Sequence, residues 1–137
     1  MLFFNKIIVF FSVLLVVSCS SSDISLNSKP TDIKSSKKLA QGISNIANCT
    51  DFENDSFQNQ IIFTCQKKVN KKNIIFRINI FYNEEEKNEY IKKILSSKEQ
   101  NRLFKTGRYY IISESLEVGT KGNIEDFMNF PGEIFIQ

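Results

Sequence analysis

Apolar and polar residues alternate along two neighbouring segments of the chain. Every second residue is apolar in one run, on Ile61, Phe63 and Cys65, and again in a longer run, on Ile74, Phe76, Ile78, Ile80 and Tyr82. Alternation with a period of two places these side chains on one face of a β-strand. The intervening segment, residues 67–73, is rich in Lys and Asn. The pattern therefore predicts two antiparallel strands joined by a solvated turn.

Two other segments carry apolar residues at helical spacing. Leu39, Ile43, Ile46 and Ala47 predict an amphipathic helix over residues 36–48, with Ser35 or Ser36 as its N-terminal cap. A second helix should follow Asn83, because carboxylates such as Glu84–Glu86 interact favourably with the positive end of the helix dipole. We favour this capping role for the three glutamates over a metal or acid–base cluster. The predicted buried stripe of this helix is Tyr90, Ile91, Ile94 and Leu95.

The remaining segments are shorter and more irregular. Residues 49–57 are polar and predict a loop, whereas residues 102–113 predict a strand with Gly107 at a turn or bulge. Four large residues in succession, Tyr109–Ile112, indicate that this strand is covered on both sides. Asn123 should cap a short helix that ends before Pro131, and residues 133–137 should form an edge strand or a docked tail.

This order of elements predicts one α+β domain over residues 38–137. We expect an antiparallel sheet of three to four strands with helices packed on one face, in a ferredoxin-like or cystatin-like layout.

The first residues of the chain describe an export signal. Lys6 precedes an apolar run from Ile7 to Val17, which is shorter than the ~20 residues that span a bilayer. A positive start, a short apolar run and small residues at its end are typical of a secretory signal peptide. The final four residues of this segment, Val16-Val17-Ser18-Cys19, resemble the lipobox of bacterial lipoproteins.

The lipobox resemblance implies cleavage after residue 18 and a thioether-linked diacylglycerol on Cys19, with palmitate or a similar acyl chain on the new amine. We therefore expect a signal peptide at 1–18 and a flexible Ser-rich tether at 19–37, with the domain lipid-anchored on the extracytoplasmic side of a membrane. The residue directly after Cys19 is Ser20, whereas an Asp at this position retains lipoproteins at the inner membrane of enteric-type bacteria. In a two-membrane cell this favours the outer membrane, and in a one-membrane cell the anchor is the cell membrane.

Two cysteines remain once Cys19 is assigned to lipid. An exported chain enters a compartment where disulfides persist, so we expect a Cys49–Cys65 bond, with two free buried thiols as the alternative. Zinc is disfavoured because the sequence contains no His to complete a tetrahedral site. Removal of Lys6 lowers the formal charge from +3 to about +2, which gives no reason to expect a nucleic-acid partner.

The sequence also resembles small lipid-anchored α+β proteins of bacteria whose function is unknown. The resemblance covers about residues 38–113, through the helix before Cys49, the strand with Cys65, and the segments FRINIFYNEEEK and TGRYYII. It implies the disulfide and the α+β fold, and it brings no catalytic residue, cofactor or metal. Because the chain lacks His and both remaining cysteines are expected to be bonded, we do not expect an enzyme.

The leading function is a binding or assembly module of the cell envelope with a protein partner, and the oligomeric state stays open. The alternative is a protective surface lipoprotein, of the immunity or inhibitor type, that sequesters a toxin or host factor. Phe81, Tyr109 and Tyr110 are candidates for an exposed partner patch. The simpler interpretation places the same three residues in the core.

Overall fold

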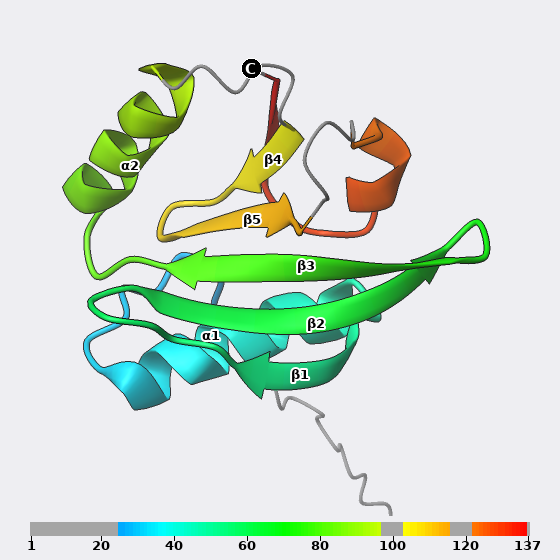
Figure 1. Ribbon diagram of the computed structural model, residues 1–137. Helices are drawn as coiled ribbons and strands as arrows, with labels where there is room; N and C mark the ends of the chain where they lie inside the picture. Colours follow the sequence, from blue (N-terminus) through cyan, green and yellow to red (C-terminus); the bar gives the residue numbers. More distant parts are fainter. Residues whose placement is uncertain (1–24, 97–102, 116–121, 137) are drawn as a thin grey trace, which may run out of the picture.

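A computed structural model describes residues 25–96, 103–115 and 122–136 (Figure 1). The elements in order are α1 (Ile33–Ile46), β1 (Thr50–Asn54), β2 (Ile61–Val69), β3 (Lys72–Ile80), α2 (Glu84–Ser96), β4 (Leu103–Thr106), β5 (Tyr110–Glu114), the 3-10 helix η1 (Ile124–Phe127) and β6 (Glu133–Ile136). The α+β class is confirmed. The order of elements differs from the βαββαβ order of the ferredoxin-like alternative, whereas the cystatin-like alternative stays a prediction.

The strands form one sheet with the order β1-β2-β3-β5-β4-β6, in which each neighbouring pair is antiparallel (Figure 1). The prediction of three to four strands was too low, since the sheet has six. β1 was taken for a loop because it has a single inward apolar residue, Phe52, which stacks on Phe63 at 5.3 Å between ring centroids. β4 and β5 were taken for one strand, and they form a hairpin around Gly107. β6 confirms the edge-strand alternative for the last segment.

The β2–β3 hairpin follows the alternation that predicted it. Its nine residue pairs run from Ile61 opposite Ile80 to Val69 opposite Lys72. Asn70 and Lys71 make the turn with positive φ angles of 51° and 69°. Two central residues with positive φ match the right-handed twist of the strands they connect.

Helices cover both faces of the sheet, so the prediction that they pack on one face was wrong. One face, here called the α1 face, carries the inward residues of the alternation and packs against α1 and η1, with Ile43, Phe63, Phe76, Ile112 and Phe127 all fully buried. The opposite face, the α2 face, has a smaller core of Ile91, Phe104 and Ile111 beneath α2. The sequence did not reveal this because the alternating apolar set marks the α1 face alone.

The ordered domain begins before residue 38, inside the segment predicted as a tether. α1 starts at Ile33, and Pro30 is fully buried. Its cap is Asp32 rather than Ser35 or Ser36, because the Asp32 carboxylate accepts a hydrogen bond from the Ser35 N–H at 2.8 Å. The Ser35 hydroxyl in turn accepts from the Asp32 N–H at 3.1 Å. This reciprocal pair lowers the pKa of Asp32, chiefly through the Ser35 backbone hydrogen bond.

The second helix begins as predicted. The Asn83 side chain accepts a hydrogen bond from the Glu86 N–H at 2.8 Å, which caps the N-terminus of α2. Within the predicted stripe Ile91 is buried and Tyr90 and Ile94 are half-buried, whereas Leu95 is 46% exposed. α2 therefore covers only part of its sheet face.

Candidate functional site

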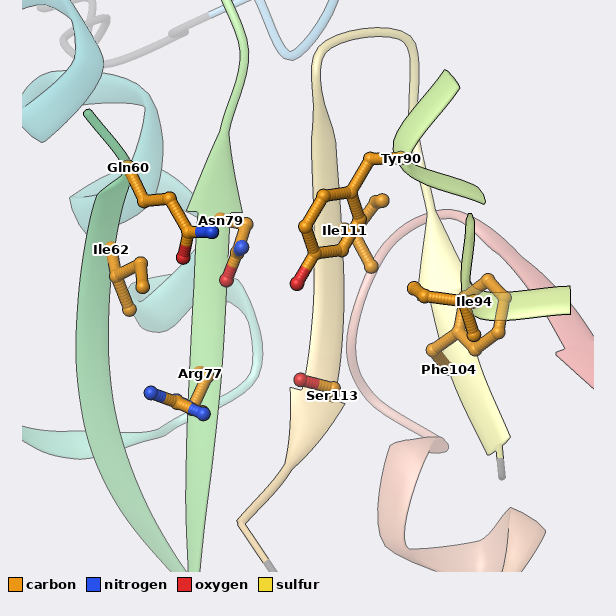
Figure 2. A pocket seen from close by; sticks show the side chains of 9 residues that line it. All are labelled: Gln60, Ile62, Arg77, Asn79, Tyr90, Ile94, Phe104, Ile111 and Ser113. Atoms are coloured by element: carbon orange, nitrogen blue, oxygen red, sulfur yellow. The ribbon is translucent and has the colours of Figure 1, made fainter. Parts of the chain in front are cut away.

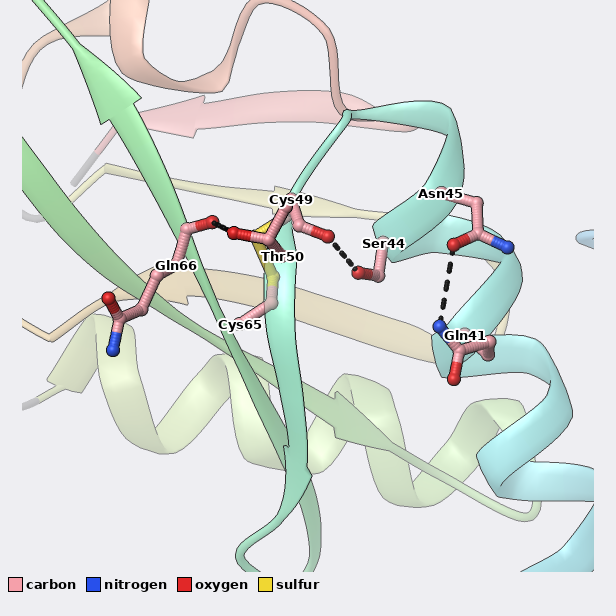
Figure 3. The surroundings of a disulfide bond; sticks show 7 residues. All are labelled: Gln41, Ser44, Asn45, Cys49, Thr50, Cys65 and Gln66. Atoms are coloured by element: carbon pink, nitrogen blue, oxygen red, sulfur yellow. Dashed lines mark hydrogen bonds between the residues drawn. A yellow bond between two sulfur atoms is a disulfide. The ribbon is translucent and has the colours of Figure 1, made fainter.

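The predicted disulfide between Cys49 and Cys65 is present (Figure 3). It joins Cys49, three residues after the end of α1, to the middle of β2, with 5.6 Å between the Cα atoms, and both cysteines are buried. Beside it the Ser44 hydroxyl donates to the Cys49 carbonyl oxygen at 2.7 Å, and the Cys49 N–H donates to the Ser44 carbonyl oxygen at 2.9 Å. The disulfide therefore ties the end of α1 to β2, and the two hydrogen bonds hold Cys49 against the last turn of the helix.

The proposed aromatic patch is not an exposed surface. Tyr109 and Tyr110 are buried and belong to the α1-face core, which confirms the simpler interpretation for these two residues. Burial raises the pKa of Tyr110 to about 12. Phe81 is half-buried and packs against Tyr90 at 5.5 Å between ring centroids. The run of large residues signalled a doubly covered strand, and the covered strand leaves no aromatic face for a partner.

The structure brings together a group of polar residues that the sequence did not single out. A hollow of about 60 Å³ lies on the α2 face, and residues of α2, β3, β4 and β5 line it together with Gln60 and Ile62 at the start of β2 (Figure 2). Its apolar floor includes Ile62 and Ile111, both buried. Polar groups from four elements or their flanks surround it, namely Gln60, Arg77, Asn79, Tyr90 and Ser113. We call these five residues the polar cluster.

Sheet register explains why the polar cluster forms. Arg77 on β3 pairs with Ser113 on β5, and Asn79 pairs with Ile111, so the side chains of Arg77, Asn79 and Ser113 emerge on the same face. Tyr90 reaches in from α2, and Figure 2 shows its ring over β5 with the hydroxyl directed along the strand toward Ser113. In sequence, Arg77 and Asn79 were visible as the polar half of an alternating strand, which is also the pattern of a solvated face.

Asn79 is the exceptional member of the cluster. The residue is only 7% exposed, and its carboxamide forms no hydrogen bond with any other residue in the described part of the chain, but its polar atoms still reach solvent. Because Asn79 lines this hollow and an adjoining one of about 130 Å³, its carboxamide is available to whatever occupies them.

Arg77 supplies the positive charge of the hollow. Its guanidinium is exposed, and within the described ranges it takes part in no ion pair, whereas Arg108 pairs with Glu84 at 2.8 Å. Glu53 pairs with Thr64, and Thr64 pairs with Arg77, so the three side chains lie on the same face of the sheet. The Glu53 carboxylate nevertheless forms no ion pair with the Arg77 guanidinium. Arg77 therefore keeps all five of its N–H donors for solvent or a ligand.

A second polar feature lies at the far end of β5, on the α1 face. Both carboxylate oxygens of Glu114 are buried without a hydrogen-bond partner among the described residues. Burial, and secondarily the neighbouring Asp126 carboxyl group, raise the pKa of Glu114 to about 8. Asp126 is itself 7% exposed and accepts a hydrogen bond from the Asn123 N–H at 3.3 Å. The carboxyl group at the end of β5 therefore lies near the one on η1, and burial together with Asp126 favours the protonated form of Glu114.

The lipid-anchor prediction at Cys19 lies outside the described residues, as do the signal peptide and residues 19–24 of the predicted tether. Within the described ranges no helix is long and apolar enough to cross a membrane. The same ranges contain no group of three or more Cys, Asp and Glu side chains placed to hold a metal ion. Comparison of the chain with protein-family models, with curated proteins and with solved structures returns no match.

Proposed function

We propose that this chain is a lipid-anchored extracytoplasmic protein, attached through Cys19, whose domain acts as a non-catalytic binding or assembly module of the cell envelope. The observation that carries the proposal is the Cys49–Cys65 bond. Two of the three cysteines of the chain are bonded inside the domain, which leaves Cys19 at the end of the apolar N-terminal run for another role. A structural disulfide is also typical of proteins that fold outside the reducing cytosol.

The binding role is supported by the uneven covering of the sheet. The α1 face carries the main core, whereas α2 leaves polar side chains of β2, β3 and β5 uncovered beside a hollow. A cavity of about 60 Å³ is far smaller than the ~300 Å³ or more of a typical small-molecule pocket. The surface therefore suits contacts with a macromolecule better than capture of a cofactor-sized ligand.

The test compares the tagged wild-type chain with a Cys19→Ala variant in cells. Membrane fractionation should place the wild type in the membrane fraction and Cys19→Ala in the soluble exported fraction. In-cell crosslinking followed by mass spectrometry should then recover an envelope complex with the wild type only. Equal solubility and export of both forms would overturn the anchor.

The identity of the crosslinked protein decides the kind of module. A component of the same envelope supports an assembly role. A membrane-bound wild type with no endogenous partner overturns the assembly role and favours the alternative, a protective lipoprotein that sequesters a foreign toxin or host factor.

A further inference from the structure

The exposed side of α1 is basic. Lys34, Lys37 and Lys38 recur at spacings of three and four, which places them on one side of the helix, and all three are exposed. The opposite side is buried where α1 lies along β1 and β2 (Figure 1). Asp32, the cap of the helix, is the one acidic residue in the segment 25–48. Within the described ranges none of the three lysines forms an ion pair.

The two α-helices differ in charge, and they lie on opposite faces of the sheet. α2 begins with Glu84–Glu86 and also contains Glu89, so its four acidic residues exceed its three lysines. α1 contains three lysines and no acidic residue within its bounds, and Lys29 precedes it. Charge that is separated in this way orients a protein toward a partner of the opposite sign, which for α1 is an anionic one.

Two exposed apolar side chains flank the basic side of α1. Ile33, the first residue of the helix, is 48% exposed, and Ile46, the last, is 52% exposed. Basic helices with exposed apolar residues are typical of membrane-surface contacts, in which the apolar side chains enter the headgroup region. Because the main apolar side of α1 is buried in the core, charge has to supply most of the attraction to a bilayer.

The position of the anchor brings this side of the domain to the membrane. Cys19 lies six residues before Ser25, where the described structure begins. Since an extended residue spans at most about 3.6 Å, Ser25 lies within about 20 Å of Cys19. Leu26 then packs on the α1-face core and Pro30 is buried, directly before α1. The chain therefore enters the domain beside α1, and the nearest large surface is that of the bilayer.

We propose that α1 docks its basic side, formed by Lys34, Lys37 and Lys38, on the anionic surface of the membrane that holds the Cys19 anchor. The ammonium groups contact lipid phosphates, and the two exposed isoleucines enter the headgroup region at the ends of the helix. This inference rests on the proposed lipid anchor and adds an orientation to it. Since α2 lies on the opposite face of the sheet, the hollow and the polar cluster face away from the bilayer, toward envelope partners.

Lysine footprinting of the full chain, isolated in detergent from its native membrane and reconstituted in vesicles, tests this orientation. One set of vesicles is phosphatidylcholine alone, and the other is an equal mixture with phosphatidylglycerol. Acetylation by an uncharged reagent, measured by mass spectrometry, should be slower at Lys34, Lys37 and Lys38 on the anionic vesicles. The exposed Lys92 and Lys93 on α2 should react equally on both. High salt should abolish the difference, because it screens exposed charges.

A pair of matched double variants separates the basic side from net charge. Lys37→Gln/Lys38→Gln removes two charges and leaves Lys34 as the reporter. Each lysine at an anionic surface contributes about fivefold, so the docking equilibrium should weaken roughly 25-fold and most of the protection of Lys34 should disappear. The control Lys92→Gln/Lys93→Gln removes two adjacent exposed charges from α2 and should leave that protection unchanged. Equal losses in the two variants would overturn the proposal.

Three other results would also overturn the docked orientation. They are equal acetylation of α1 on both kinds of vesicle, equal protection of the α1 and α2 lysines on anionic vesicles, and protection of Lys71 and Lys72 in the β2–β3 hairpin in place of α1. If vesicles leave α1 unprotected while Lys37→Gln/Lys38→Gln abolishes the crosslinked envelope complex, the basic side binds an acidic protein and not lipid.

Failure of this inference is distinguishable from failure of the proposed anchor. Flotation of the chain with phosphatidylcholine vesicles depends on the anchor and not on the charge of α1. A chain that floats but shows no protection keeps the anchor and loses the docking. A chain that does not float with these vesicles overturns the anchor, and this inference with it.

Discussion

Loss of the Cys49–Cys65 bond should destabilise the domain strongly. The perturbation is the double variant Cys49→Ala/Cys65→Ala, or reduction of the wild type. The bond closes a loop with a sequence separation of 16. In the chain-entropy model a loop of this length contributes about 3 kcal/mol by restricting the unfolded chain. Because domains of this size are stable by only about 5–15 kcal/mol, this is a large share of the total.

Two comparisons separate the covalent link from the packing of the sulfur atoms. Cys65 is fully buried and Cys49 is 6% exposed, so the alanine variant also loses buried side-chain volume. Reduction of the wild type breaks the link while both sulfur atoms remain in place. The reduced wild type therefore isolates the loop-closure contribution, and the double variant adds the packing loss to it.

The assay is thermal and denaturant unfolding of the oxidised wild type, the reduced wild type and the double variant. We expect the midpoint of the reduced protein to fall by roughly 10–20 °C, as about 3 kcal/mol implies for a domain of this length. The double variant should be insensitive to reductant. Equal stability of the oxidised and reduced wild type would refute the reasoning, and so would two alkylatable thiols in the protein isolated from its native membrane.

Three further predictions concern particular side chains. Asn79→Val should raise the free energy of unfolding by up to about 1 kcal/mol, because an apolar side chain replaces a largely buried one that forms no hydrogen bond among the described residues, whereas the exposed control Asn73→Val should not; equal effects would contradict this account. The pKa of Glu114 is about 8 in the folded chain and near 4.5 when unfolded, so the folded state binds more protons between these values. Stability should therefore fall as pH rises from about 4.5 to 8, and Glu114→Gln should flatten that slope in urea titrations at several pH values; an unchanged slope would exclude Glu114 as its source. Gly107→Ala should cost about 1–3 kcal/mol in thermal unfolding, because the new methyl group would overlap the Tyr110 ring, and a neutral result would show that the ring moves aside freely.

Local patterns predicted the elements whose side chains repeat regularly. The alternation of Ile61, Phe63 and Cys65 identified β2 and its buried face, and the polar turn located the hairpin. The cap at Asn83 was also visible, since it depends on residues three apart. The Asp32 cap was missed because Asp32, Ser35 and Ser36 can each accept a hydrogen bond from a backbone N–H at the start of a helix. Pro30 is buried and Leu26 packs on the core, and this packing sets where the chain enters α1.

The polar cluster could not be predicted in the same way. Arg77 and Asn79 have the spacing of an ordinary solvated strand face, and the sequence does not show that Asn79 is buried. Asn79 shares its hollow with Tyr90 of α2 and with Gln60 beside β2, and β5, not β4, pairs with β3 there. The position of Ser113 beside Arg77 is a property of that pairing, and it joins residues 36 positions apart.

The sequence by itself determined the α+β class, the β2–β3 hairpin, the start of α2 and the pairing of Cys49 with Cys65 as the expected disulfide. Each of these depends on contacts within a short stretch of chain or on a count of residue types. Only the tertiary structure decided the six-strand order, the covering of both sheet faces and the grouping of polar residues around the hollow. The physical reason is that these features come from long-range strand pairing and packing, where one residue's environment is set by segments distant in sequence.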